Sequence, residues 1–510
     1  MYLCADMQIR HILLTKNGSN CSPWLLPLLL PLIVWGLYGL LLVVMPECLD
    51  YRLIYTPLDS LIKIRPALYP ALALGFVLLL LIPFPSIAKK KEPSPLFSKK
   101  THSYLEDGAL LSWTLGYGNI LFGVIPSVIG LLIPFIVGSL FHIIYALKMG
   151  EKPSIHPRGY IFFILLYLCY DLLTILWARN FTVALDWWWR EASLLPPLLL
   201  LAIYPPSEST IHRLMHYALR IVYLYILANI AVYATVCLLS GNSLGVALCF
   251  EKCYFSFNHE ATSPAFLAMV FGLQHYTYLG ILMLIPLLYI LLVERGNRAH
   301  IPLAVVTLLG FISYLFIFQS RILILIILAL LLLIALERMT HWSYPKLLLG
   351  GALLGIVGSV LLLLTRPSSL SYLIDDHRLN LLTTASRYLG DHLWEGYGLG
   401  SAKSLIFPFY QGMYATHFHN QYVLCLLEGG IPSLILWVGI WGSYLYHALK
   451  RSNYPALLMG VVMAILFTVD LITCLSQYLI SMGMMLLFLL LSHPHNYGIS
   501  RDFPKAKGTR

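Results

Sequence analysis

Charged residues are scarce in this sequence. Asp, Glu, Lys and Arg together make up 11% of its 510 residues, whereas soluble globular proteins carry about 25%. Hydrophobic residues make up 59%, and apolar runs extend from residue 24 to residue 492. A protein surface with so little charge needs lipid rather than water as its solvent. The shortage of charge therefore excludes a soluble enzyme and indicates one membrane-embedded bundle.

Signatures of metal and nucleotide chemistry are also missing. The sequence has no CxxC pair, no phosphate-binding loop that ends in Gly-Lys-Ser/Thr, and no Asp-x-Asp motif on an expected cytoplasmic loop. We therefore expect neither a bound metal nor a cofactor. The net charge of +10 is spread over short loops, so we expect no nucleic-acid partner. Cys249 and Cys253 share one polar loop and either form a disulfide or remain thiols.

Long apolar runs predict an all-α, polytopic transmembrane helix bundle. About 20 apolar residues are needed to cross a bilayer, which gives this sequence about 12–14 spans. The runs lie at 24–46, 67–86, 109–125, 127–147, 160–178, 193–204, 216–240, 263–293, 302–318, 322–336, 346–365, 422–447, 456–471 and 473–492. The division is ambiguous at 109–147, at the short run 193–204 and at the long run 263–293.

Basic residues in the loops predict the orientation of the chain. The densest basic loop contains Lys89–Lys91, so we place it in the cytoplasm. Alternation from there puts both termini in the cytoplasm and gives the inner loops about twice as many Lys and Arg residues as the outer ones. It also puts the longest polar segment outside. The expected parts are an N-terminal bundle 1–365, an extracytoplasmic loop 366–421, C-terminal helices 422–492 and a basic tail 493–510.

The sharpest chemical signal lies at the end of this long outer loop. His417 and His419, followed by Asn420, stand directly before the apolar run 422–447. Imidazoles titrate near neutral pH, so both are placed for proton transfer at the membrane surface. The alternative is a histidine pair that only caps the loop. A metal shared by the two histidines would need a third ligand, which no spacing in the sequence supplies.

Arginines give two further signals on the same expected side. Arg321 lies between two apolar runs, where a guanidinium is costly unless it is paired or faces a wet cavity. The alternative there is an arginine that reaches out to lipid phosphates. Arg378 and Arg387 precede a Gly-rich stretch at 396–400. They either clamp a diphosphate or pair with acidic residues of the same loop.

Three consecutive tryptophans stand at 187–189, between Asp186 and Arg190. Such a segment is typical of the aromatic belt at a membrane–water interface. Beyond a surface on which sugars could stack, we assign it no chemistry.

The motif around His419 resembles the signature of the bacterial O-antigen ligase and O-antigen polymerase superfamily. In that signature a His followed by Asn, Ser or Gln precedes, after nine residues, Gly-x-x and then Gly, Thr or Tyr. Here Gly430 fills the glycine position, and Ser433 departs from the last position by another small residue. The pair Ser320-Arg321 and the run from Arg378 through the Gly-rich stretch are also similar to the family. The resemblance covers about residues 300–450.

This resemblance implies a glycosyltransferase with a GT-C-like bundle. Such an enzyme transfers a glycan from a polyprenyl-diphosphate carrier to an acceptor hydroxyl at the outer face of the bacterial inner membrane, as in lipopolysaccharide biosynthesis. His419 would match the catalytic base, while Arg321 and Arg378 would match arginines that bind the diphosphate. His417, Arg387 and Asn420 would be further substrate-binding residues. The acceptor stays open between lipid A core, another glycan and a protein.

A second hypothesis is a transporter or flippase of lipid-linked saccharides. It predicts ionisable residues at mid-membrane and two related halves of the chain. Asp171 and Asp470 are the main acidic residues near the ends of spans, and no internal repeat is visible in the sequence.

Overall fold

The computed structural model describes residues 99–122, 128–155, 157–193, 195–239, 276–293, 301–317, 321–365, 376–406 and 418–468. Within these ranges all regular secondary structure is helical, which confirms the all-α prediction for this part of the chain. The expected spans 24–46, 67–86 and 473–492 and the pair Cys249 and Cys253 lie outside the described residues.

The first half of the described chain is a row of helices that follows the predicted apolar runs. Two helices lie in the region 109–147, where the sequence left the division ambiguous. The run 193–204 yields a helix of only nine residues, too short to cross a bilayer. The helices are α4 (Lys99–Phe122), α5 (Val128–Lys148), α6 (Arg158–Thr174) with the 3-10 turn η3 (Ile175–Trp177), α7 (Phe181–Ala192), α8 (Leu195–Ile203) and α9 (Glu208–Leu239).

The second half contains the remaining apolar helices and two helices of the long polar segment. These two show that the segment expected to be one large loop is folded in the parts described. The helices are α13 (Tyr276–Leu292), α14 (Ile301–Ile317), α15 (Arg321–Thr340), α16 (Tyr344–Thr365), α18 (Asp376–Leu389), α19 (Ala402–Ile406), α20 (Gln421–Lys450) and α21 (Tyr454–Leu466).

Several of these helices suit a lipid environment. Among the described residues, the segments Arg158–Trp177, Ile322–Thr340 and Gln421–Lys450 are long and apolar enough to cross a membrane. On α15, Leu325, Leu328 and Leu332 are all exposed and share one face of the helix. A stripe of exposed leucines is unfavourable in water but not in lipid, so the chain is an integral membrane protein.

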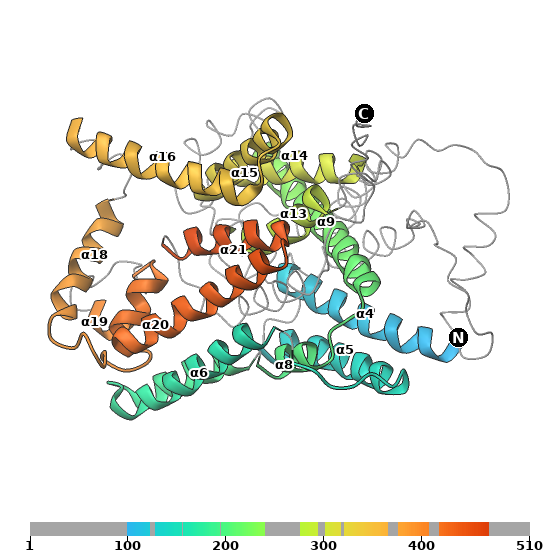
Figure 1. Ribbon diagram of the computed structural model, residues 1–510, viewed down its shortest axis with the longest axis horizontal. Helices are drawn as coiled ribbons and strands as arrows, with labels where there is room; N and C mark the ends of the chain where they lie inside the picture. Colours follow the sequence, from blue (N-terminus) through green and yellow to red (C-terminus); the bar gives the residue numbers. More distant parts are fainter. Residues whose placement is uncertain are drawn as a thin grey trace, which may run out of the picture.

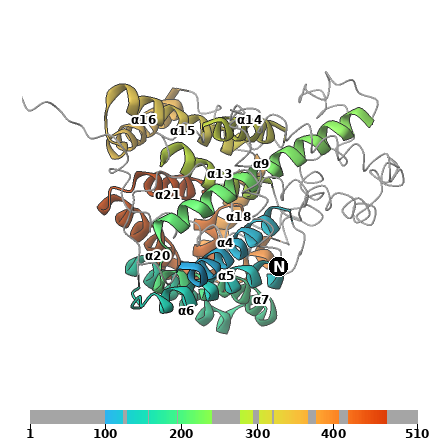
Figure 2. The same ribbon diagram turned by 90° about the vertical axis from the view of Figure 1, so that its right-hand side faces the viewer.

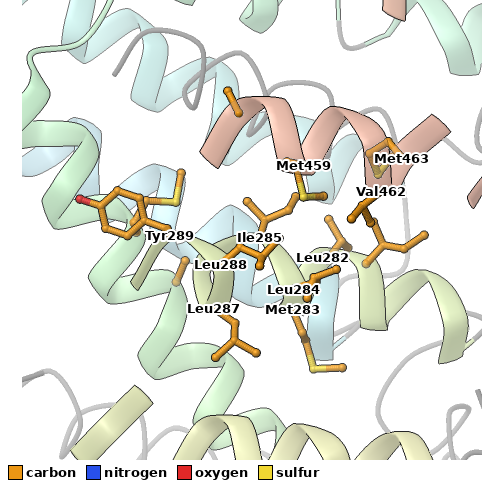
Figure 3. Close-up of a cluster of buried hydrophobic side chains, with 14 of the residues drawn as sticks. Leu282, Met283, Leu284, Ile285, Leu287, Leu288, Tyr289, Met459, Val462 and Met463 are labelled. Atoms are coloured by element: carbon orange, nitrogen blue, oxygen red, sulfur yellow. The ribbon is translucent and has the colours of Figure 1, made fainter. Parts of the chain in front are cut away.

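Part of the main core forms where α20 packs against α6 and α21. Aromatic rings fill the α6–α20 contact: Tyr160 lies 5.5 Å from Tyr444, and Tyr167 lies 5.5 Å from Trp437. Buried side chains of α13 meet Met459, Val462 and Met463 of α21, as Figure 3 shows. Helix α20 is therefore held on two sides along its length.

The two helices of the long polar segment lie beside the start of α20, at one end of the molecule (Figure 1). A separate apolar cluster joins them to α20, with Leu381 from α18, Leu405 from α19, and Leu424 and Leu427 from α20. In the view of Figure 2, α7 lies next to α6. These contacts gather the segments that carry the sequence motifs around one end of α20.

Candidate functional site

The start of α20 is fixed by a capping residue of the predicted motif. Asn420 is the N-cap: its Oδ1 accepts a hydrogen bond from the Val423 N–H at 3.0 Å. Its Nδ2 donates to the Thr468 carbonyl at 3.0 Å, and the Gln421 N–H donates to the Phe467 carbonyl at 2.9 Å. Asparagine is among the best N-cap residues because its side-chain oxygen accepts from a backbone N–H group in the first turn that would otherwise be unpaired. Asn420 thus ties the beginning of α20 to the end of α21.

His419 is held in an uncommon backbone conformation directly before this cap. Its φ is 49°, in the left-handed region that side chains other than glycine seldom adopt. On one side Phe418 is buried in the apolar cluster around α18 and α19, and on the other Asn420 begins the helix. Such strain persists only where the surroundings impose it, and it is concentrated at functional sites.

Helix α20 is broken nine residues after its start. Gly430 has φ 67° and ψ −164°, which is not helical, and Pro432 follows without an N–H group to donate. The break leaves backbone groups without their helical partners. The Gly429 carbonyl accepts from the Tyr170 hydroxyl at 2.8 Å, and the Ile431 N–H donates to the Leu393 carbonyl at 3.0 Å.

The Gly-rich stretch occupies this break. We call residues 393–401 the glycine loop. Its Tyr397 N–H donates to the Leu427 carbonyl, and its Gly398 N–H donates to the Glu428 carbonyl, both at 2.8 Å. The loop therefore satisfies carbonyl groups that the broken helix leaves open. Two motifs that are about 30 residues apart in the sequence thus form one structural unit.

Glycine is required on both sides of this contact. A Cβ atom on Gly396 would lie 2.5 Å from the Glu428 carbonyl oxygen, and one on Gly430 would lie 2.1 Å from the Trp394 carbonyl oxygen. Gly396, Gly398 and Gly400 also have φ between 68° and 86°, a conformation that glycine adopts at little cost.

Four backbone N–H groups of the glycine loop donate hydrogen bonds within the protein. Besides the two bonds to α20, the Gly396 N–H donates to the His392 carbonyl at 2.9 Å and the Ser401 N–H to the Gly398 carbonyl at 3.2 Å. These amides cannot also cradle a phosphate. The loop is therefore a bracket that positions its neighbours.

Glu428 holds the far end of the loop. This carboxylate is buried, and its Oε1 accepts a hydrogen bond from the Ala402 N–H, the first residue of α19, at 3.0 Å. Because its carbonyl also accepts from Gly398, one residue of α20 binds both ends of the segment 398–402. Sequence analysis did not single out Glu428. Its only signal there was an acidic residue inside an apolar run.

The turn between α6 and α7 closes the other side of the loop. The Trp177 Nε1–H donates to the Glu395 carbonyl at 3.2 Å, and the Arg179 N–H donates to Ser401 Oγ at 3.3 Å. The Arg179 guanidinium lies 5.1 Å from the centre of the Tyr397 ring. Arg179 was also missed from the sequence, where its signal was a cation directly after the apolar run 160–178 on the expected outer side.

Polar side chains surround Tyr397 on the exposed side of the loop. His392 Nδ1 lies 2.7 Å from Glu395 Oε1, and this hydrogen bond lowers the pKa of the Glu395 carboxyl. The His392 ring lies 4.5 Å from the ring of Tyr397. Burial and the nearby Asp391 carboxylate raise the pKa of Tyr397. Its hydroxyl therefore stays protonated and donates to the Tyr388 carbonyl of α18 at 3.1 Å.

The structure describes the other predicted site residues in less detail. Arg321 is the first residue of α15 and Arg378 lies in the first turn of α18, but their side chains lie outside what the structure describes, as does all of His417. Arg387 lies exposed in the last turn of α18. The apolar cluster around Phe418 therefore brings the segment that contains His419 and Asn420 together with α18 and with Tyr397 of the glycine loop. Within the described residues, no three His, Cys, Asp or Glu side chains could hold a metal ion.

The region that contains these elements has a known relative. Residues 307–438 match the family model described as O-antigen ligase. This region is an O-antigen ligase domain. The family predicted from the His419 motif is thereby confirmed. The O-antigen ligase domain includes Arg321, α18, the glycine loop and the break in α20, whereas the α6–α7 turn that closes the loop lies upstream of it. No curated protein matches the chain significantly.

Proposed function

We propose that the protein is a glycosyltransferase that moves a glycan from a polyprenyl-diphosphate carrier to an acceptor hydroxyl. The single observation that carries this proposal is the glycine loop seated in the break of α20, the helix that begins two residues after His419, inside the O-antigen ligase domain. A histidine held in a strained conformation directly before a capped helix is suited to proton transfer, because catalytic groups need a fixed position.

In this proposal His419 is the base. Its imidazole takes the proton of the acceptor hydroxyl, whose oxygen forms a bond to the anomeric carbon while the bond from that carbon to the diphosphate oxygen breaks. The lipid diphosphate leaves with the electron pair of that bond. A general base contributes about 10²–10⁴-fold to the rate. Losing it should therefore slow transfer severely while donor binding persists.

Charge on the leaving diphosphate needs cationic side chains, since the N–H groups of Gly396, Tyr397, Gly398 and Ser401 in the glycine loop are already bonded. We assign this role to Arg321 and Arg378, because fixed guanidinium groups in a poorly hydrated site stabilise developing charge. Arg387, His417 and Asn420 are the further substrate-binding residues of the proposal. For Asn420 the contribution is the observed cap, which fixes His419.

The proposal also covers the setting of the reaction. A GT-C-like bundle of about 12–14 spans would lie in the bacterial inner membrane with both termini in the cytoplasm. The chain would consist of an N-terminal bundle 1–365, an extracytoplasmic loop 366–421, C-terminal helices 422–492 and a basic tail 493–510. A donor tethered to the membrane explains why no nucleotide motif is needed. The acceptor is lipid A core, another glycan or a protein.

One observation favours the alternative, a transporter of lipid-linked saccharides. His212, His216 and Arg220 are buried and follow one another at four-residue intervals along α9, and Asp171 is buried on α6. Ionisable residues inside a membrane bundle often mark a transport path. The two functions differ in one respect: a transporter moves the glycan without forming a new glycosidic bond.

Complementation of a deletion strain tests the proposal. We expect the deletion to accumulate lipid-linked glycan at the outer face and to lose the glycosylated product. His419→Ala should fail to restore the product at matched membrane abundance. The control is His341→Ala, because His341 also has a positive φ (57°) but lies exposed in the turn between α15 and α16. Full product with His419→Ala would refute the base, and glycan trapped at the inner face would favour the transporter.

A further inference from the structure

We propose that the turn at residues 391–395, which we call the tryptophan turn, binds a sugar ring of the glycan, with that ring stacked on Trp394. The turn overlaps the start of the glycine loop and lies inside the O-antigen ligase domain. The ligand is a pyranose that belongs either to the donor glycan or to an acceptor glycan. The inference deepens the proposed function and rests on it, because it assigns the place where the carbohydrate part of a substrate is held.

The tryptophan turn presents apolar side chains at the surface of the protein. Trp394 is 69% exposed, and its neighbour Leu393 is 38% exposed. Both lie in the turn itself rather than along the side of an apolar helix, and the residues on either side of them, His392 and Glu395, are polar. An exposed apolar surface with a polar rim is typical of a ligand-binding site.

The backbone of the tryptophan turn is anchored on two sides. The Leu393 carbonyl accepts from a backbone N–H of α20 at 3.0 Å, and the Glu395 carbonyl accepts from the Trp177 Nε1–H at 3.2 Å. Between them, the Trp394 carbonyl faces Gly430, where a Cβ atom would lie 2.1 Å from its oxygen. Three consecutive carbonyl groups thus face the protein, while the side chains of Leu393 and Trp394 stay exposed. A platform that is fixed before binding loses little entropy when a ligand arrives.

Polar side chains close the turn and form its rim. His392 Nδ1 lies 2.7 Å from Glu395 Oε1, and the Gly396 N–H donates to the His392 carbonyl at 2.9 Å. Both side chains of the pair are about half exposed, and Asp391 beside them is exposed as well. Each partner has a second polar atom, His392 Nε2 and Glu395 Oε2, that can bond to a hydroxyl group. The apolar platform therefore has hydrogen-bonding groups at its edge.

This combination fits a sugar ring better than a lipid chain. A pyranose has a face of C–H groups that packs on an indole ring, and a rim of hydroxyl groups that bond to carboxylates and imidazoles. An acyl chain has no hydroxyl groups, and the charged side chains beside Trp394 would be costly in hydrocarbon. The turn is held by Trp177, the last residue of the membrane-spanning segment Arg158–Trp177. It therefore lies at the end of that span, where a glycan on a lipid carrier emerges from the bilayer.

Photo-crosslinking of the full chain to the cell's own lipid-linked glycan tests the site. p-Benzoylphenylalanine replaces Trp394 in the complemented deletion strain, and the cells are irradiated. The matched control carries the same label in place of Trp342, which is 57% exposed in the turn between α15 and α16. Adducts are separated by gel electrophoresis, stained for carbohydrate and identified by mass spectrometry. We expect a carbohydrate-bearing adduct at position 394 that is absent at position 342 and absent from cells unable to assemble the glycan.

Three results would overturn the proposal. An adduct with phospholipid alone would make Trp394 a member of the aromatic belt at the membrane interface. An adduct with another protein would make the turn a protein contact. A labelled protein that still transfers glycan but forms no carbohydrate adduct would show that no sugar lies against the turn. A carbohydrate adduct on a protein whose wild type performs no transfer would instead support the sugar site and refute the proposed function.

A second arm identifies which glycan is bound, by varying the concentrations of lipid-linked donor and of acceptor separately. Trp394→Ala should raise the KM of the substrate that carries the bound sugar by about tenfold, because an apolar contact surface is lost. The change in kcat should be much smaller. Trp394→Phe keeps an aromatic face and should raise the same KM by less than about threefold. A raised donor KM assigns the site to the donor, and a raised acceptor KM assigns it to the acceptor. A fall in kcat with both KM values unchanged would contradict the proposal.

Discussion

Gly430 lies directly against the backbone of Trp394, so closely that a Cβ atom on Gly430 would come within 2.1 Å of the Trp394 carbonyl oxygen. This contact joins the break in α20 to the glycine loop. It explains why position 430 is glycine, since a side chain there would separate α20 from the loop. Gly396 is needed on the loop for the same reason, because a Cβ atom there would meet the Glu428 carbonyl oxygen.

The first prediction concerns this contact. Gly430→Ala should lower transfer by more than about tenfold, because the new Cβ forces the loop out of the break and disturbs the site behind it. The control is Gly442→Ala on the same helix, where a Cβ would meet nothing within 4 Å. That variant should keep full transfer and gain a little thermal stability. Wild-type transfer by Gly430→Ala would show that the contact does not matter for function.

The second prediction concerns Glu428. Glu428→Ala removes the acceptor for the Ala402 N–H, so amide exchange in the segment 396–402 should become about tenfold faster, as expected for a lost buried hydrogen bond of about 1–2 kcal/mol. Glu428→Gln keeps a side-chain oxygen at the same place and should retain most of the protection. Hydrogen exchange measured by mass spectrometry checks both. Equal exchange in all three proteins would contradict the bracket role of Glu428.

The third prediction separates stability from function at two helix caps. Asn420 caps α20 and Asn453 caps α21, where it accepts from the Ala456 N–H at 3.2 Å. Either change to Ala should cost about 0.5–2 kcal/mol of stability. Only Asn420→Ala should also reduce transfer, because only Asn420 adjoins His419. Thermal unfolding and product formation measured on the same preparations check this, and equal transfer losses would contradict it.

The fourth prediction concerns Tyr397. Tyr397→Phe removes the hydroxyl that donates to the Tyr388 carbonyl and should cost about 0.5–1.5 kcal/mol. Tyr397→Ala also removes the ring that contacts Arg179 and His392, so it should loosen α18 and the α6–α7 turn together. Limited proteolysis near residues 179 and 388 checks this. Protection of both sites in Tyr397→Ala would show that the ring does not connect them.

Much of the helical architecture could be predicted from the sequence, because apolar runs long enough to cross a bilayer seldom occur outside transmembrane helices. The His419 motif identified the family through its resemblance to the signature of that family. The predicted segment 366–421 proved to contain α18 and α19.

Three features could not be predicted in this way. The break at Gly430 was hidden because glycine and proline inside membrane helices are tolerated in many contexts. Arg179 and Glu428 were missed because their roles come from contacts between segments distant in sequence, and a single sequence gives no sign of such pairs.

The most direct test of the account is transfer by the purified protein in liposomes with a polyprenyl-diphosphate-linked glycan and a hydroxyl acceptor. Released lipid diphosphate and glycosylated acceptor are measured together for the wild type, His419→Ala and His341→Ala. We expect equal amounts of both products from the wild type and His341→Ala, and a rate lower by about 10²–10⁴-fold for His419→Ala. Glycan that crosses the bilayer still attached to its carrier, with no diphosphate released, would contradict the account.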